Sequence, residues 1–144
     1  PRPMIDSKDF DFSFAGLKTA VRVYLDRGDT VSVEDVAASF QQAVVDVLVA
    51  KTLRAAQSTQ PKSIILSGGV SANRLLRETL SNAIQSRFSG DSDGDKAPMK
   101  FYCPDFSLTG DNAAMIGAAG LMKATRGEFV DPLTLKADPN MRLA

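Results

Sequence analysis

The chain has 144 residues, a formal net charge of zero, one Cys and no His, and apolar residues make up 44% of it. This length is typical of one domain with a core, and the balanced charge gives no indication of a nucleic-acid or membrane surface. A chain without His and with one Cys cannot form a Ser-His-Asp triad, a His-ligated metal site, a cysteine zinc cluster or an internal disulfide. No apolar run approaches the roughly 20 residues that cross a bilayer, and the start at Pro1 without Met suggests a piece of a longer protein.

The first predicted elements are an extended stretch over residues 9–14 and a helix over about 14–27. Aromatic and polar residues alternate in the stretch, so we expect it to bury Phe10, Phe12 and Phe14 on one face. The helix ends at Gly28, and its side chains at helical spacing form an apolar face. The residues of that face are Leu17, Val21, Tyr24 and Leu25. Two of its basic residues, Lys18 and Arg22, lie on one face of the helix and are either solvated or meet phosphate.

The longest predicted helix covers about residues 33–57. Ser32 can cap its start with Asp35 as the return partner, and Pro61 follows its end. Apolar residues at helical spacing should line one buried side. They are Val36, Phe40, Val44, Val47 and Leu48.

Two strands and two further helices alternate in the rest of the chain. Residues 63–66 form an apolar run typical of a strand covered on both faces, and residues 99–103 form a second strand that Pro104 stops. Helices are predicted over about 72–88 and 111–126, the second capped by Thr109 or Asp111 and ended by Gly127. The side chains expected to be buried are Leu76, Leu80, Ala83 and Ile84 in one helix and Ala114, Met115, Ala118 and Met122 in the other. The alternation predicts an α/β fold with parallel strands, but two strands make a poor sheet, so further strands must come from missing sequence or a partner.

Two segments are predicted to be irregular. Residues 89–97 are polar, acidic and rich in Gly, which indicates an exposed loop, and their Asp spacing does not fit a calcium loop. Residues 128–144 contain two Asp-Pro pairs and are predicted to form an irregular tail. Cys103, at the end of the second strand, is interpreted as a small core residue.

The turn after the first strand is the first candidate for a binding site. Gly68 and Gly69 allow a ligand to approach the backbone closely, and the following helix start offers free N–H groups. Asn73 can donate and accept hydrogen bonds to a ribose or base. The alternative is a tight strand-to-helix connection in which Asn73 lies near a helix cap. Spacing alone does not decide between these two readings, because isolated glycine motifs are weak signals.

The turn after the second strand is the other candidate. It leads to Asp111 and should face the same edge of the sheet as the glycine turn. Asp111 is either a helix cap or a metal ligand. One carboxylate does not make a metal site, so the second reading requires ligands from outside this chain.

Three segments together resemble the tRNA N6-threonylcarbamoyladenosine transferase family, which is also called the glycoprotease or O-sialoglycoprotein endopeptidase family. They are residues 11–19 (DFSFAGLKT), 67–74 (SGGVSANR) and 111–116 (DNAAMI). Their order and spacing agree with that family over nearly the whole chain, and the details are similar to its bacterial or organellar branch. The resemblance implies an actin/Hsp70-like ATPase fold of two α/β lobes. Residues 1–144 would be most of the C-terminal lobe, an incomplete parallel sheet flanked by helices.

The resemblance also implies a reaction and its partners. The full enzyme would transfer a threonylcarbamoyl group from threonylcarbamoyl-AMP to N6 of adenosine 37 in tRNAs that read codons beginning with A. Implied partners are tRNA, threonylcarbamoyl-AMP or ATP, a paralogous same-fold subunit and a small ATPase, with no membrane. The implied location is the bacterial cytoplasm, or a mitochondrion or plastid. We expect the fragment to be inactive by itself.

The site residues that the resemblance implies are few. Gly68, Gly69 and Asn73 match the nucleotide-binding motif, and Asp111 matches a ligand of one iron or zinc ion. The other two metal ligands would be histidines of the absent lobe. An alternative is a catalytically silent paralogue that acts as an interaction module. The presence of both Asn73 and Asp111 disfavours it, and the segment at residues 11–14 disfavours a kinase lobe of the same superfamily.

Overall fold

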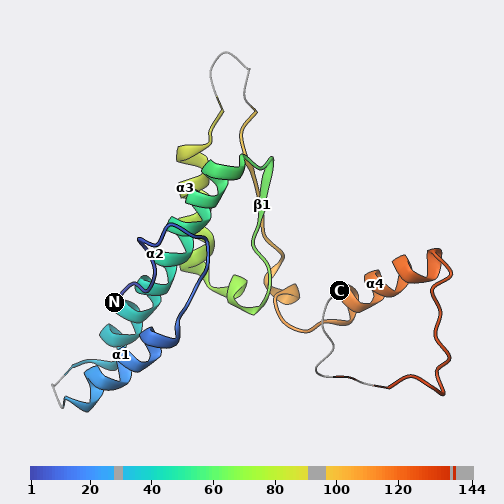
Figure 1. Cartoon of the computed structure of the whole chain (residues 1–144), viewed down its shortest axis with the longest axis horizontal. Helices are drawn as coiled ribbons and strands as arrows, with labels where there is room; N and C mark the ends of the chain where they lie inside the picture. The colour runs from blue at the N-terminus through green and yellow to red at the C-terminus, as the bar shows by residue number, and fades with distance from the viewer. Residues whose placement is uncertain (28–30, 91–96, 137, 139–144) are drawn as a thin grey trace. The chain divides into compact units, whose positions relative to one another are not determined.

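The computed structural model describes residues 1–27, 31–90, 97–136 and 138, and it has the predicted α/β class. Its helices are α1 (Ala15–Asp26), α2 (Val33–Thr59), α3 (Arg74–Arg87) and α4 (Ala113–Thr125), and its strands are β1 (Ser63–Ile65) and β2 (Lys100–Tyr102). Two short 3-10 helices, η1 (Gly69–Ala72) and η2 (Phe106–Leu108), follow the strands (Figure 1). The predicted four helices and two strands are therefore confirmed in type and order. The chain divides into two compact units, residues 1–109 and residues 110–144.

The core of the first unit lies between α2 and α3, which pack side by side (Figure 1). The predicted burial of Leu76, Leu80 and Ile84 in α3 is confirmed, and Ala83 packs beside them. Opposite them, α2 contributes Val45, Val49 and Leu53. Ile64 and Phe101 of the strands pack against this cluster from the sheet.

The predicted buried side of α2 is confirmed in part. Val47 is buried, and Val36, Val44 and Leu48 are half-buried, whereas the Phe40 side chain is 41% exposed. The buried residues lie further along the helix and on two faces, because α3 covers one face and the N-terminal segment covers another. Val47, Lys51 and Arg54 share that second face at helical spacing.

The start of α2 has a hydroxyl cap, as predicted. The Ser32 hydroxyl accepts a hydrogen bond from the Asp35 amide at 3.3 Å and donates to the Glu34 carboxylate at 2.6 Å. Asp35 thus contributes its backbone amide to the cap, and the neighbouring carboxylate contact comes from Glu34. At the other end, Gln60 adopts a left-handed conformation with φ of 47°, and Pro61 prevents continuation of the helix.

By length and composition alone, α2 could cross a membrane. In the structure its apolar side chains pack against α3, and the buried ammonium of Lys51 bonds to the N-terminal segment. We therefore interpret α2 as the core helix of the first unit.

The two strands pair in parallel, with Ser63, Ile64 and Ile65 opposite Lys100, Phe101 and Tyr102. The prediction of a strand covered on both faces is wrong for the described residues. Helices α2 and α3 cover one face, whereas the Ile65 and Tyr102 side chains on the other are 71% and 51% exposed. A sheet of two strands with helices on one side has no second layer to bury that face.

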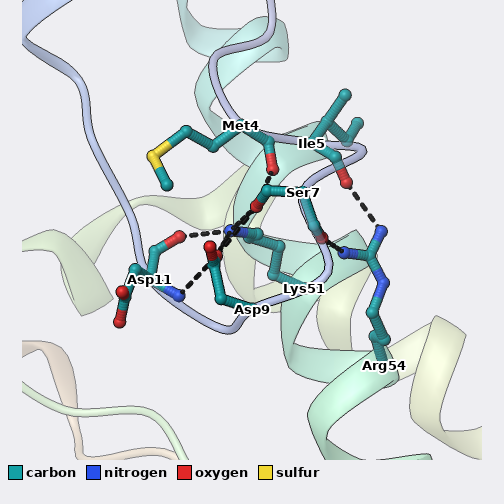
Figure 2. Close-up of polar contacts among 7 residues, drawn as sticks. All are labelled: Met4, Ile5, Ser7, Asp9, Asp11, Lys51 and Arg54. Carbon is teal, nitrogen blue, oxygen red and sulfur yellow. Dashed lines mark hydrogen bonds and ion pairs between the residues drawn. The ribbon is translucent and has the colours of Figure 1, made fainter.

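A polar contact holds the N-terminal segment, residues 1–14, on α2 (Figure 2). The fully buried Lys51 ammonium donates to the Ser7 hydroxyl at 2.7 Å, to the Asp9 carboxylate at 3.0 Å and to the Asp11 carbonyl. The Arg54 guanidinium donates to the carbonyls of Ser7 and Ile5, at 2.5 Å and 2.6 Å. We call these contacts the Lys51 clamp.

The clamp explains why the predicted burial of three Phe rings is wrong. Polar atoms of the segment take the contacts with α2, and Phe10 and Phe12 remain 43% and 46% exposed. The Phe12 ring contacts α2 through the Lys51 ammonium, which lies 5.7 Å from the ring centroid. Phe14 is half-buried and stacks on Phe12, with ring centroids 6.4 Å apart.

Helix α1 buries only one of its four predicted apolar residues. Leu17 is 2% exposed, but Tyr24 and Leu25 are 40% and 50% exposed. A cavity of about 700 Å³ between α1 and α2 is lined by Tyr24 and accounts for its exposure, whereas Leu25 does not line this cavity. Helix α1 ends at Asp26, and the predicted stop at Gly28 lies outside the described residues.

The second unit contains α4 and the tail. Gly127, with φ of 70°, ends α4 as predicted, and the Glu128 amide bonds to the Lys123 carbonyl at 3.0 Å. The predicted buried stripe is wrong: Met115 and Met122 are 50% and 64% exposed, and α4 has no buried residue among those described. One helix and an irregular tail cannot make a core by themselves.

The two segments predicted to be irregular contain no helix or strand where they are described. Residues 128–136 form turns and extended chain. Ser89, Gly90 and Ala97 are exposed, and residues 91–96 of the predicted loop lie outside the described part of the chain. Cys103 is a free, half-buried thiol.

Candidate functional site

Two loops leave the same edge of the sheet. Because β1 and β2 are parallel neighbours, their carboxyl ends meet, which confirms the expectation that both turns face one edge. We call residues 66–73 the first loop and residues 103–109 the second loop. The first contains Gly68, Gly69 and Asn73, and the second leads to Asp111.

The first loop is a compact turn that depends on Gly68. Its φ of 83° and ψ of 176° fall in a region that is essentially restricted to glycine. The Gly68 carbonyl accepts hydrogen bonds from the amide of Ser71 at 2.9 Å and from its hydroxyl at 2.6 Å. Ser71 is completely buried, so it fixes the turn from inside.

Space for a ligand exists beside the glycines. A Cβ atom added at Gly68 or Gly69 would meet no heavy atom within 4 Å. Glycine is therefore needed at position 68 because of its backbone angles and not because of a close neighbour. The open space beside both glycines lies outside the turn. The close approach of a ligand to this backbone stays a prediction.

Asn73 is the N-cap of α3. Its Oδ1 atom accepts a hydrogen bond from the Leu76 amide at 3.0 Å, and its Nδ2 atom donates to Oε1 of Gln41 at 2.8 Å. The helix starts at Arg74 rather than at Ala72, because η1 occupies the intervening residues. The capping role is thus observed, and the contact of Asn73 with a nucleotide stays a prediction. Gln41, an exposed residue of α2, had no signal in the sequence.

Arg77 joins the two loops, and sequence analysis missed it. Its Nε atom donates to the Ser71 carbonyl in the first loop, and its guanidinium carbon lies 3.9 Å from the ring centroid of Phe106 in the second. Arg74 lies over the same ring at 5.7 Å. The available signal was spacing: Arg77 follows Asn73 by four residues, which places both at the start of α3 on one side.

The second loop is fixed by its own polar contacts. The Asp105 carboxylate accepts hydrogen bonds from the amide and hydroxyl of Ser107, at 2.9 Å and 2.7 Å. These bonds, together with the positive charge of Arg77, lower the pKa of the Asp105 carboxyl. The Thr109 hydroxyl donates to the Phe106 carbonyl at 2.8 Å, which orients the ring-bearing residue.

Asp111 follows this loop, in the second unit, and is exposed. Neither of the two predicted caps, Thr109 and Asp111, caps α4: the cap is Asn112, whose Oδ1 atom accepts from the Met115 amide at 2.9 Å. Among the described residues the Asp111 carboxylate makes no hydrogen bond or ion pair.

The donor set for a metal is limited. In the described part of the chain, no three residues among His, Cys, Asp and Glu lie close enough to hold an ion. The exposed Asp111 carboxylate fits a metal as a single oxygen ligand. Coordination by Asp111 stays a prediction that needs ligands from outside the chain.

Comparison with known proteins places these features in a family. The model of the tRNA N6-adenosine threonylcarbamoyltransferase family matches residues 1–118. Relatives with that name are 48% identical in Lactobacillus delbrueckii subsp. bulgaricus, over 99% of this chain, and 46% identical in Thermotoga neapolitana, over 98% of it. A relative from Moorella thermoacetica is 44% identical over 99% of the chain. The chain spans about 40% of the length of each of these relatives.

Proposed function

The chain belongs to the tRNA N6-adenosine threonylcarbamoyltransferase family, and from this premise we propose that it is part of an enzyme that modifies tRNA. The proposed reaction transfers the threonylcarbamoyl group from threonylcarbamoyl-AMP to N6 of adenosine 37 in tRNAs that read codons beginning with A. The family match over residues 1–118 carries this proposal. The chain spans about 40% of the length of its relatives, and we expect activity to require residues outside it.

We propose that the first loop holds the nucleotide part of the donor. Open space beside Gly68 and Gly69 supports a close approach of the ligand to the backbone. Asn73 keeps bonding capacity after capping α3, because an amide NH₂ group has two hydrogens and Gln41 takes one of them. The second hydrogen can bind a ribose or base atom of the nucleotide.

A metal ion, iron or zinc, is the proposed cofactor of the complete enzyme. Asp111 would supply one carboxylate oxygen, and the remaining ligands would come from outside the chain. When bound, the metal would act as a Lewis acid that polarises the carbamoyl carbonyl. The observation that favours Asp111 is that capping of α4 by Asn112 leaves its carboxylate available.

Positioning is the main contribution that we assign to this chain. The donor is a mixed anhydride, which is already activated, so holding it in line with the tRNA amine supplies much of the rate. The sequence contains no His, so a Ser-His or Cys-His pair cannot form within it. The first loop would hold the donor while the rest of the enzyme presents the tRNA.

The exposed apolar surface supports a role within a larger protein. Side chains of α4 and the tail that a core would normally bury are open. They include Ile116, Leu121, Met122 and Phe129, which are 64–77% exposed. We propose that residues of the complete lobe cover part of this surface. The other proposed partners are a same-fold paralogue and a small ATPase, in the bacterial cytoplasm or in an organelle.

A chimeric enzyme tests the proposal. This chain replaces the matching segment of the Lactobacillus delbrueckii relative, and threonylcarbamoyl transfer to tRNA is measured beside the parent enzyme. We expect the chimera to be active and the isolated 144-residue chain to be inactive. A chimera that melts like the parent but forms no modified tRNA would contradict the proposed function.

Substitutions at position 73 separate capping from binding. Asn73→Asp and Asn73→Ser keep a good N-cap oxygen but remove the amide donor. We expect both variants to fold normally and to show a raised KM for the adenylate. An unchanged KM in both would limit Asn73 to the capping role.

A further inference from the structure

Arg77 is a cation whose role the proposed function leaves open. It is half-buried, and its Nη2 atom is buried without a hydrogen-bond partner among the described residues. Burial of an unpaired part of a guanidinium is unfavourable, so the contacts of its other atoms must offset that cost. Those contacts go to two different loops.

The first contact fixes the glycine turn. Arg77 Nε donates to the carbonyl of Ser71, the residue whose amide and hydroxyl both bond to the Gly68 carbonyl. A guanidinium is planar and holds its donors in a rigid fork, so this bond sets the orientation of the whole group. Through Ser71, Arg77 therefore controls the position of the backbone at Gly68.

The second contact fixes the loop after β2. The guanidinium carbon of Arg77 is 3.9 Å from the ring centroid of Phe106, within the range of a strong cation–π interaction. The ring edge is open, because Phe106 is 47% exposed, so Arg77 holds this residue without burying it in a core. Asp105 is close enough for the charge of Arg77 to lower its pKa, which adds an attraction between the same two elements.

We propose that Arg77 is a positioning residue that locks the first loop to the second loop. The hydrogen bond to Ser71 and the contact with the Phe106 ring both come from the rigid guanidinium of Arg77. A shift of one loop relative to the other therefore breaks one of these two contacts. The lock keeps the turn at Gly68 and the segment before Thr109 in a fixed relation. We expect the lock to give tight binding of the nucleotide donor, and this consequence rests on the proposed function. The lock itself rests on the contacts alone.

Hydrogen exchange in the 144-residue chain tests the lock directly. The variants are Arg77→Met, Arg77→Lys and Phe106→Leu. The reporting amides are those of Ser71 and Asn73 in the first loop and of Leu108 and Thr109 in the second, all of which are hydrogen-bonded. Arg87→Met is the matched control, because Arg87 lies in the same helix, is exposed and bonds to the neutral Gln57.

Loss of a charged hydrogen bond and a cation–π contact should speed exchange at least about thirtyfold in both loops of the Arg77→Met variant. Arg77→Lys should behave similarly, because an ammonium cannot stack and donate as a planar fork. The decisive variant is Phe106→Leu, which does not touch the first loop but should still speed exchange at Ser71. Unchanged exchange at Ser71 in Phe106→Leu, or full protection in Arg77→Lys, would overturn the lock.

Kinetics of the chimeric enzyme test the consequence. Arg77→Met and Arg77→Lys should raise the KM for threonylcarbamoyl-AMP about tenfold with an unchanged melting temperature, and Arg87→Met should leave both unchanged. A fall in kcat and melting temperature without a change in KM would show a merely structural role and refute the positioning role. If the chimera with Arg77 intact is inactive while exchange in the 144-residue chain responds as expected, the proposed function fails and the lock stands.

Discussion

Replacement of Lys51 by Met should detach the N-terminal segment from α2. Met has a similar length and helix propensity but carries no charge. Lys51→Met therefore removes the three hydrogen bonds of the ammonium and its cation–π contact with the Phe12 ring, 5.7 Å away. The side chain is fully buried, and its partner Asp9 has a side chain that is 50% exposed. In the Lys51–Asp9 ion pair the ammonium therefore cannot reach water, whereas the carboxylate can.

The exposures of Lys51 and Asp9 determine how much unfolding free energy the Lys51→Met variant should lose. Removal of one member of a fully buried ion pair costs about 3–5 kcal/mol. Here water can solvate Asp9 after the change, and the buried ammonium no longer has to be desolvated, so we expect a smaller loss of about 2–3 kcal/mol. With a urea m-value of about 2 kcal/mol/M, that loss lowers the unfolding midpoint by about 1 M.

Urea unfolding and hydrogen exchange measure this loss. The Ser7 amide bonds to the Met4 carbonyl at 3.1 Å within the clamped segment, so its exchange should accelerate in Lys51→Met. Lys18→Met is the matched control, since it removes one positive charge from an exposed helical position and should change stability by less than about 0.5 kcal/mol. Equal midpoints and equal Ser7 exchange in the two variants would refute the clamp as a stabilising contact.

Three other predictions concern titration, the glycine turn and the start of α4. Hydrogen bonds from Ser7 and Lys51 lower the pKa of Asp9 in the folded state. The ionised Asp9 therefore contributes its full stabilisation above the ordinary Asp pKa of 3.8, and this stabilisation is lost as the pH falls through the lower folded value. Unfolding measured as a function of pH should show this loss, and the Asp9→Asn variant should no longer show it. Gly68→Ala should destabilise the chain by about 1–3 kcal/mol because of its backbone angles, whereas Gly69→Ala, which lacks a positive φ, should cost clearly less in the same unfolding assay. Asn112→Ala should lower the stability of α4 by about 1 kcal/mol, seen as lost helical circular dichroism, and an equal loss in Asp111→Ala would show that the cap is assigned to the wrong residue.

The sequence was sufficient for features that depend on near neighbours. Apolar residues at helical spacing determined the buried face of α3, a left-handed Gly determined the end of α4 at Gly127, and the strand-to-helix pattern determined that both loops leave one edge of the sheet. The three motifs, which are local as well, were sufficient for the family. In each case the physical signal lies within a few residues of the feature that it predicts.

Tertiary structure decided the features that depend on distant residues. Lys51 and Arg54 bond to residues more than 35 positions away in the sequence. No local sequence pattern predicts that the apolar helix α2 buries the charge of Lys51. With these polar contacts in place, the Phe10 and Phe12 rings remain partly exposed, against the expectation from alternation. Arg77 gained its role because folding brings η2 beside α3, and α4 kept its apolar side chains exposed because burial requires a second surface as well as an amphipathic sequence.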